Sequence, residues 1–142
     1  MEISENFKKY LSGFFDGDGS ITVEKLNTSS YTLRIKFYQA NEDWINTIQR
    51  YYPFLKKSNN QQRKDNTRIQ YELRAAGKQI EPLVDDLLKY SILKYEQLLE
   101  AKKFFDLINV KDKSNEKETI YNSWSNIGTR WWWFWLLFDN GQ

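Results

Sequence analysis

The spacing of hydrophobic positions changes from a helical to a strand period within the first forty residues. Apolar and aromatic residues recur at helical spacing over 6–17, which predicts an amphipathic first helix. Over 20–39 the period becomes two, with Ile21 and Val23 alternating with polar neighbours and a polar turn at 27–30. The second pattern predicts a β-hairpin with one apolar face and one polar, partly basic face.

A helix and a second hairpin follow in the same order. Asn41 is a suitable N-cap for a second helix that Pro53 ends. Residues 54–76 again alternate around a very polar turn, and we expect Ile69 on the apolar side. A third helix after Gly77 and a fourth over 92–107 complete the pattern.

The element order α-β-β-α-β-β-α-α predicts an α+β fold. Its 142 residues suit one domain, and no Gly- or Pro-rich boundary divides 1–142. We expect the two hairpins to form a concave antiparallel sheet, with helices covering its back. The core spans about 6–107, and 114–142 is read as a C-terminal helical extension. The aromatic run Trp131–Phe138 within it either packs on an incomplete core or contacts a ligand or partner.

Composition restricts the chemistry that this chain can perform. Histidine and cysteine are both absent, which excludes imidazole bases, Ser-His triads, thiolate nucleophiles and zinc sites built on these ligands. Carboxylates, lysines, amides or a metal held by oxygen remain. The acidic N-terminus lacks an apolar segment, and the aromatic run is far shorter than the ~20 residues of a membrane span. We therefore expect an intracellular protein with no membrane partner.

Positive charge is concentrated in the two predicted hairpins. They carry nine Lys or Arg against three Asp or Glu, a net +6, whereas the whole chain carries +2 and the remainder therefore −4. A local positive field suits a phosphate-bearing partner because salt screens charge within ~8–10 Å. Lysine is also a common way to solvate a hairpin, so charge alone leaves both interpretations open.

The segment Leu11–Ser20, LSGFFDGDGS, places two carboxylates where the first helix should end. Negative charge opposes the dipole at a helix C-terminus, and burying it is costly unless a cation is bound. Oxygen ligands of this kind suit Mg²⁺. A calcium loop of the EF-hand type is excluded, because Ile21 stands at the required glycine and Asn27 at the required glutamate.

This decapeptide resembles the motif of the LAGLIDADG homing endonucleases, close to its variant LAGFVDGDGS. The resemblance covers about 6–107 and implies the family's α-β-β-α-β-β-α fold with C-terminal helices. It implies a metal-dependent nuclease that hydrolyses phosphodiester bonds in double-stranded DNA. The implied metal ligands are Asp18 and Gly17, with Mg²⁺ or Mn²⁺ as cofactor, or Ca²⁺ in a non-cleaving complex.

The resemblance assigns two further active-site residues. Gln39, in the stretch FYQAN, matches the glutamine that orders water at the end of the family's second strand. Lys94, in SILKYEQ, matches the lysine that lies beside the scissile phosphate. Some members carry a basic residue four positions after the glutamine, but here that position is Asp43. Arg68 or Arg74 could fill this role.

The family contains long chains with two motifs and short chains with one motif that dimerise. Only one copy occurs here, which implies a homodimer acting on a long, near-palindromic DNA site. Small residues on one helix face favour close packing against a symmetry mate. The expected interface residues are Ser12, Gly13, Asp16 and Gly17.

The polar faces of the hairpins are expected to read DNA. The candidate contacts, assigned by strand alternation, are Thr22, Glu24, Thr32, Arg34, Lys36, Tyr38, Arg68, Gln70, Glu72 and Arg74. The alternative function is a non-cleaving nucleic-acid binder on the same scaffold, such as an intron maturase or a transcription regulator. Neither the target sequence nor the host element can be derived from the sequence.

Overall fold

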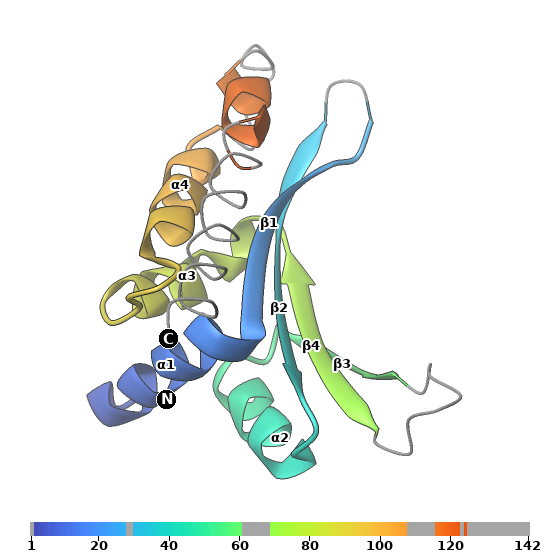
Figure 1. The fold of residues 1–142 in the computed structure, drawn as a ribbon, viewed down its shortest axis with the longest axis vertical. Helices are drawn as coiled ribbons and strands as arrows, with labels where there is room; N and C mark the ends of the chain where they lie inside the picture. Colours follow the sequence, from blue (N-terminus) through green and yellow to red (C-terminus); the bar gives the residue numbers. More distant parts are fainter. Residues whose placement is uncertain (1, 28–29, 61–68, 108–115, 123, 125–142) are drawn as a thin grey trace, which may run out of the picture.

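The computed structural model describes residues 2–27, 30–60, 69–107, 116–122 and 124. Helices pack on one face of an antiparallel sheet of four strands in this part of the chain, and the other face is open (Figure 1). In chain order the elements are α1 (Glu5–Asp18), β1 (Gly19–Lys25), β2 (Tyr31–Gln39), α2 (Glu42–Tyr51), β3 (Lys56–Asn60), β4 (Gln70–Ala76), the 3₁₀ helix η1 (Lys78–Ile80), α3 (Glu81–Leu88) and α4 (Tyr95–Phe105). The predicted α+β order is confirmed.

The sheet joins the two predicted hairpins side by side. Its strand order is β1-β2-β4-β3, with every neighbouring pair antiparallel, and Gln39 of β2 lies opposite Tyr71 of β4. Alternate side chains of β2 are buried, among them Leu33, Ile35 and Phe37 with no exposed surface. Strand residues of the other parity therefore face the open side, as the sequence pattern predicts.

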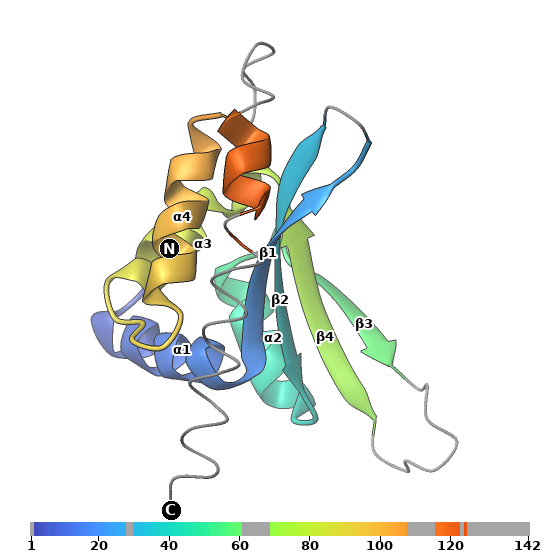
Figure 2. The same ribbon diagram turned by 45° about the horizontal axis from the view of Figure 1, so that its top comes forward.

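The buried face of the sheet shares a hydrophobic core with the helices. Leu11 and Phe15 come from α1, Ile45 and Ile48 from α2, and α3 and α4 complete the layer (Figure 2). Each fully buried side chain of this size contributes about 1.5–3 kcal/mol. The same packing fixes the end of α1 against the start of β1.

Local caps determine where the first two helices begin. The Ser4 hydroxyl accepts a hydrogen bond from the Phe7 N–H at 3.2 Å and starts α1. Asn41 caps α2 as predicted, its amide oxygen accepting from the Trp44 N–H at 3.1 Å. Side-chain oxygens satisfy otherwise unpaired N–H groups of a first helical turn in this way.

Three details differ from the sequence prediction. The fourth helix begins at Tyr95 instead of residue 92, because residues before it form a turn bound to α1. Gly77 does not open a helix directly; it adopts φ +86°, a conformation that favours glycine, and the η1 turn follows. Ile69 is 41% exposed, and it lies just before β4 begins.

The C-terminal extension returns to the sheet. Residues 116–122 are helical, and the ring of Tyr121 lies 5.6 Å from that of Tyr31 on β2. The Trp124 indole is buried and donates to the carbonyl of Ile21 on β1 at 3.2 Å. The Trp131–Phe138 run lies outside the described residues. Within the described part, no helix has the length and apolar character needed to cross a bilayer.

Candidate active site and nucleic-acid interface

The end of α1 and one end of the central strands meet at the same edge of the sheet. Asp18 is the exposed last residue of α1, and its carboxylate forms no hydrogen bond or ion pair within the described part of the chain. Gly19 starts β1 opposite Phe37, and Gln39 stands two residues further along β2. The carboxylate of Asp18 and the amide of Gln39 are thus placed at one edge, as the sequence predicts.

Lys94 reaches this edge from the turn before α4. Its ammonium donates to the carbonyl oxygens of Phe15, at 3.0 Å, and of Gly19. The first of these belongs to the last turn of α1, where a cation is favoured by the helix dipole. Burial lowers the pKa of Lys94, while the nearby carboxylates of Asp16 and Asp18 oppose this shift.

The carboxylate of Asp16 is occupied within its own chain. It accepts hydrogen bonds from the Ser91 hydroxyl and from the backbone N–H groups of Ile92, Leu93 and Lys94. The sequence assigned Asp16 to a dimer interface, yet its polar atoms bind the turn that carries Lys94. No local sequence signal predicts these bonds, because at least 75 residues separate the partners.

The ligands available for a metal are few but chemically suitable. Asp18 offers a free carboxylate, and Gly17 is among the last four residues of α1, whose carbonyls have no partner within the helix. The described part of the chain contains no cluster of three or more acidic side chains placed to hold a metal ion. Mg²⁺ commonly takes one or two carboxylates, with waters and substrate phosphates as its other ligands. The residues present fit such a site.

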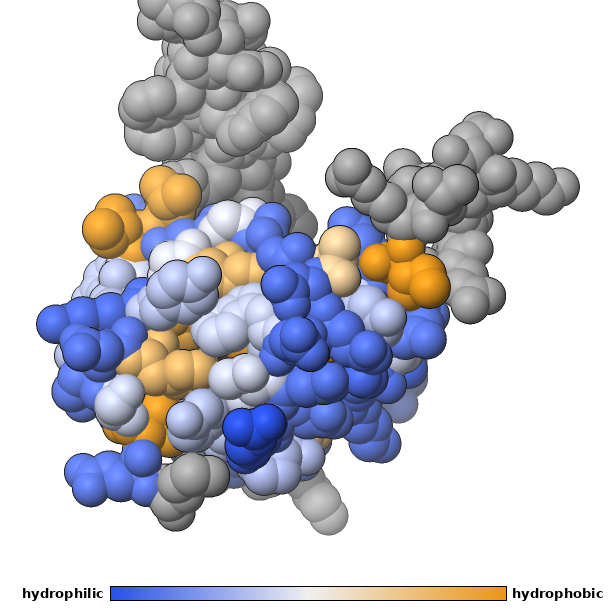
Figure 3. All heavy atoms as spheres, turned by 90° about the horizontal axis from the view of Figure 1, so that it is seen from below, coloured by the Kyte–Doolittle hydropathy of each residue, from blue (hydrophilic) through white to orange (hydrophobic). Residues whose placement is uncertain are grey.

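One face of α1 remains open to solvent. Tyr10, Gly13 and Gly17 follow one another at helical spacing and are all exposed, Tyr10 by 68% of its surface. A Cβ added at either glycine would find no atom within 4 Å apart from its chain neighbours and the backbone of its own helix. Ser12 does not share this face, contrary to the sequence-based assignment: it is fully buried and donates to the Lys8 carbonyl at 2.8 Å. Figure 3 shows the molecule from below, with several separate apolar patches among hydrophilic residues, which are most continuous toward the right of the view.

The open face of the sheet displays the side chains expected from strand alternation. Those that are exposed or half-buried there are Thr22, Glu24, Thr32, Arg34, Lys36, Tyr38, Gln70, Glu72 and Arg74. Arg68 lies outside the described residues. Arg74 is not beside Gln39, because it pairs with Lys36, three positions along β2.

Three cations form a row across this face. Arg74 of β4 lies directly opposite Lys36 on β2 and Lys56 on β3, and none of them has an ion pair within the described part. Like charges at directly opposed positions destabilise a sheet. The sequence did not identify Lys56, because the predicted hairpin over 54–76 does not give the register that places this residue opposite Arg74.

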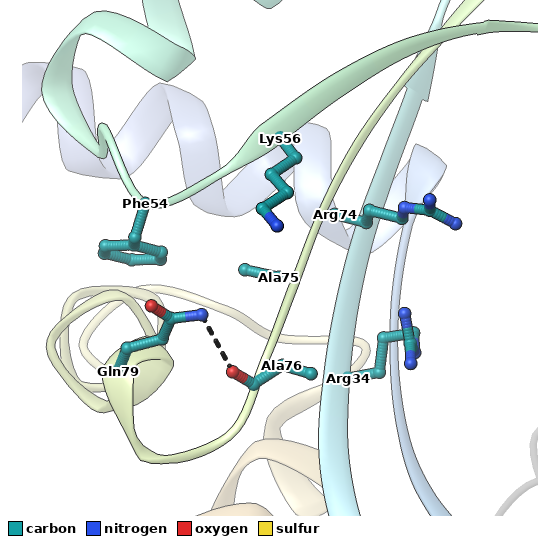
Figure 4. A pocket seen from close by; sticks show the side chains of 7 residues that line it. All are labelled: Arg34, Phe54, Lys56, Arg74, Ala75, Ala76 and Gln79. Carbon is teal, nitrogen blue, oxygen red and sulfur yellow. Dashed lines mark hydrogen bonds between the residues drawn. The ribbon is translucent and has the colours of Figure 1, made fainter.

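The row borders a basic hollow of about 280 Å³ where the end of β4 lies beside the first half of β2. Arg34 and Arg74 extend on the same side of the sheet, and Lys56 extends from β3 toward the hollow (Figure 4). Gln79 holds the opposite wall through a 3.0 Å hydrogen bond to the Ala76 carbonyl. Such a hollow is suited to an anion.

Two acidic residues partly neutralise the positive charge of the open sheet face. Glu24 accepts from the Arg34 guanidinium at 2.9 Å, across β1 and β2. Glu72 accepts from the Ser58 hydroxyl at 3.2 Å and hydrogen-bonds to Tyr38. Burial raises the pKa of Tyr38, and its bond to Glu72 raises it further. The polar side chains of this face are thus held in pairs with one another, and a bound ligand can replace one member of a pair as the bonding partner.

Comparison with known proteins identifies this arrangement. The chain resembles the homing endonuclease I-CvuI, solved in complex with its target in the presence of calcium, at 18% identity and a TM-score of 0.71 over 87% of this chain and 82% of that chain. It resembles the archaeal intron-encoded homing endonuclease I-Vdi141I complexed with DNA at 16% identity and a TM-score of 0.71, over 87% and 86% of the two chains. These likenesses establish the fold.

A more distant structural match is the group I intron-encoded homing endonuclease I-CeuI complexed with DNA. It has 15% identity and a TM-score of 0.57, over 77% of this chain and 58% of that chain. No curated protein sequence matches the chain. The family model described as LAGLIDADG endonuclease matches residues 11–112, most of the chain, and begins at the first residue of the motif. This protein therefore belongs to the LAGLIDADG endonuclease family.

Proposed function

We propose that this protein is a site-specific endonuclease that hydrolyses both strands of duplex DNA with a divalent cation. In this proposal it acts as a homodimer on a long, near-palindromic site. The observation that carries the proposal is the position of the unpartnered Asp18 carboxylate, one residue from the start of a cationic sheet face. A protein that only bound DNA would gain nothing from a free carboxylate beside the phosphates, because like charges repel.

The dimensions of the open face suit the major groove. The nine residues of β2 extend about 30 Å, and duplex DNA rises ~3.4 Å per base pair, so one copy can follow about nine base pairs. The cation row and the basic hollow supply phosphate contacts, and the polar side chains between them face the base edges. Two copies would follow about twenty base pairs.

The residues at the sheet edge have distinct roles in cleavage. Asp18 and the Gly17 carbonyl would hold the cation, which supplies positive charge to the phosphate oxygens and the leaving oxygen as negative charge develops. The amide of Gln39 orders water at the same edge. Lys94 keeps a positive charge beside Asp18 and fixes the end of α1 through the carbonyls of Phe15 and Gly19.

A second copy completes the site. One Asp18 carboxylate per chain is too few for cleavage of two strands. The open face of α1 offers two glycines where another helix can approach closely. Packing α1 on its symmetry mate brings two Asp18 residues near the two-fold axis. Two close carboxylates repel unless cations bind between them, which links dimer formation to metal binding.

Cleavage of a random duplex library tests the proposal directly. The protein is incubated with the library and Mg²⁺, with EDTA as the matched control, and the cut ends are sequenced. We expect Mg²⁺-dependent double-strand ends within one near-palindromic sequence. Enrichment of bound duplexes without cut ends would instead establish a non-cleaving binder, and no enrichment of any sequence would reject both functions.

A further inference from the structure

The two aspartates of the motif have different surroundings. The Asp18 carboxylate has no bonding partner in the described part of the chain, whereas the carboxylate of Asp16 accepts four hydrogen bonds. The three backbone donors lie at 2.8 Å from Ile92 and at 3.2 Å from Leu93 and Lys94. The hydrogen-bonding capacity of the Asp16 carboxylate is thus used within its own chain.

These bonds hold the turn that leads into α4. Lys94 is the N-cap residue of α4, and its side chain makes no capping bond. The Asp16 carboxylate accepts from the N–H groups of the two residues before Lys94 and of Lys94 itself, so it holds the turn and does not cap the helix. The start of α4 therefore has a defined position only while this turn is attached to the end of α1.

The backbone and the side chain of Lys94 together bind the end of α1 and the start of β1. Its backbone N–H donates to Asp16, and its ammonium donates to the carbonyls of Phe15 and Gly19, on either side of Asp18 in the sequence. The ammonium also lies 5.3 Å from the centre of the Phe15 ring. The position of the lysine therefore depends on the turn that Asp16 holds.

We infer that Asp16 is a positioning residue, which acts through the Ser91–Lys94 turn to place the Lys94 ammonium beside Asp18. Its role in DNA cleavage rests on the proposed function, while its hold on the turn does not. The motif then contains one aspartate that holds the cation and one that holds the lysine. Asp16 itself contacts neither metal nor DNA in this arrangement.

The hold on the turn is tested without DNA or metal. Hydrogen exchange of the amides of 92–94, and acylation of the Lys94 amine followed by mass spectrometry, are compared in the full chain and in Asp16→Asn and Ser91→Ala. We expect exchange at these amides to accelerate by about tenfold or more in Asp16→Asn, and the Lys94 amine to become more reactive. Ser91→Ala should show the same changes to a smaller degree.

Tyr52→Phe is the matched control. It removes a 2.7 Å hydrogen bond to a carboxylate, that of Asp86, in another part of the core. It should lower overall stability but leave the exchange of 92–94 and the reactivity of Lys94 unchanged relative to other amides. Equal protection of the turn in Asp16→Asn and in the parent protein would overturn the inference.

The effect on cleavage is tested by combining substitutions. Asp16→Asn should lower kcat on the selected site by about tenfold or more, with little change in KM, because DNA contacts on the sheet remain. In a Lys94→Ala background the same substitution should add little, since the residue it positions is absent. A purely structural role would give additive losses instead and would contradict the inference.

The possible failures are distinguishable. If the parent chain cuts no DNA, the proposed function fails, while hydrogen exchange still decides whether Asp16 holds the turn. If Asp16→Asn releases the turn but kcat is unchanged, the turn is held for stability alone and the positioning role is wrong.

Discussion

The ring of Phe15 occupies the space that a side chain on Gly19 would need. A Cβ built at Gly19 would lie 2.2 Å from Cδ1 of this fully buried ring. The backbone at Gly19 has φ −100°, which any residue can adopt, so packing and not backbone conformation requires glycine there. The motif's last glycine thus allows a core side chain to lie directly under the turn that carries Asp18.

Gly19→Ala should therefore destabilise the fold by about 1–3 kcal/mol, because the ring is enclosed and must shift. Urea unfolding measures the change. Phe15→Leu opens space at the same point, so the double variant should lose less stability than the two single losses combined. Strict additivity would show that the contact between these residues is not the cause.

Asp18→Asn should lower Mg²⁺-dependent cleavage by about a hundredfold or more and leave DNA affinity equal or higher. The change removes a proposed metal ligand and also a negative charge near the phosphates. A nicking assay and a gel shift on the same preparation separate the two effects. Asp106→Asn, at the exposed C-terminal cap of α4, is the control with the same loss of charge. Full activity in Asp18→Asn would remove this residue from the mechanism.

Strand alternation was sufficient to predict both hairpins and their faces. In β2 each apolar residue from Leu33 to Phe37 is buried, and each polar neighbour lies on the open face. Alternation does not set the register between the two strands of a hairpin with a long turn, and this is why Lys56 was missed. It also does not predict how far Ile69 is buried, since this residue precedes β4 and is 41% exposed.

The resemblance predicted which candidate residues lie together but not the bonds that hold them. Asp18, Gln39 and Lys94 reach one edge of the sheet, as expected from the resemblance. The bonds of Asp16 join residues 75 to 78 positions apart, and helical spacing alone could not tell that Ser12 faces inward. Such contacts depend on how α1 packs on α3 and α4, which no local pattern encodes.

Lys56→Ala should weaken DNA binding and reduce the salt dependence of log K by about one unit, as for the loss of one phosphate contact. The fold itself should be equally or more stable, since the substitution relieves repulsion with Arg74. Titrations at several salt concentrations measure the slope.

Lys57→Ala is the matched control for this prediction. The neighbouring lysine points to the other face, where its ammonium lies 2.9 Å from both the Glu42 carboxylate and the Asn46 amide oxygen. Its loss should leave the salt slope unchanged. Equal effects of the two substitutions would show that the open face is not the DNA surface.

Tyr52→Phe should change how stability depends on alkaline pH. Burial and a hydrogen bond to Asp86 raise the pKa of the Tyr52 hydroxyl above its ordinary value of about 10. The folded state therefore keeps this proton when the unfolded state has lost it. The resulting stability is complete below pH ~10 and declines as pH rises further. Unfolding measured from pH 8 to 11 should show a shallower decline in the variant, and identical slopes would contradict the assignment.

Gly13→Leu tests the assembly, because the isolated chain has room for the new side chain. Nothing but its chain neighbours and the backbone of its own helix lies within 4 Å of a Cβ at this position, and leucine favours a helix over glycine by up to ~1 kcal/mol. The single chain should stay folded, but a second α1 could no longer approach closely. We expect sedimentation to show a monomer, or a loosened dimer that binds DNA without cutting it. Unchanged dimerisation and cleavage would place the interface elsewhere, and a parent protein that stays monomeric on an asymmetric site would exclude the homodimer.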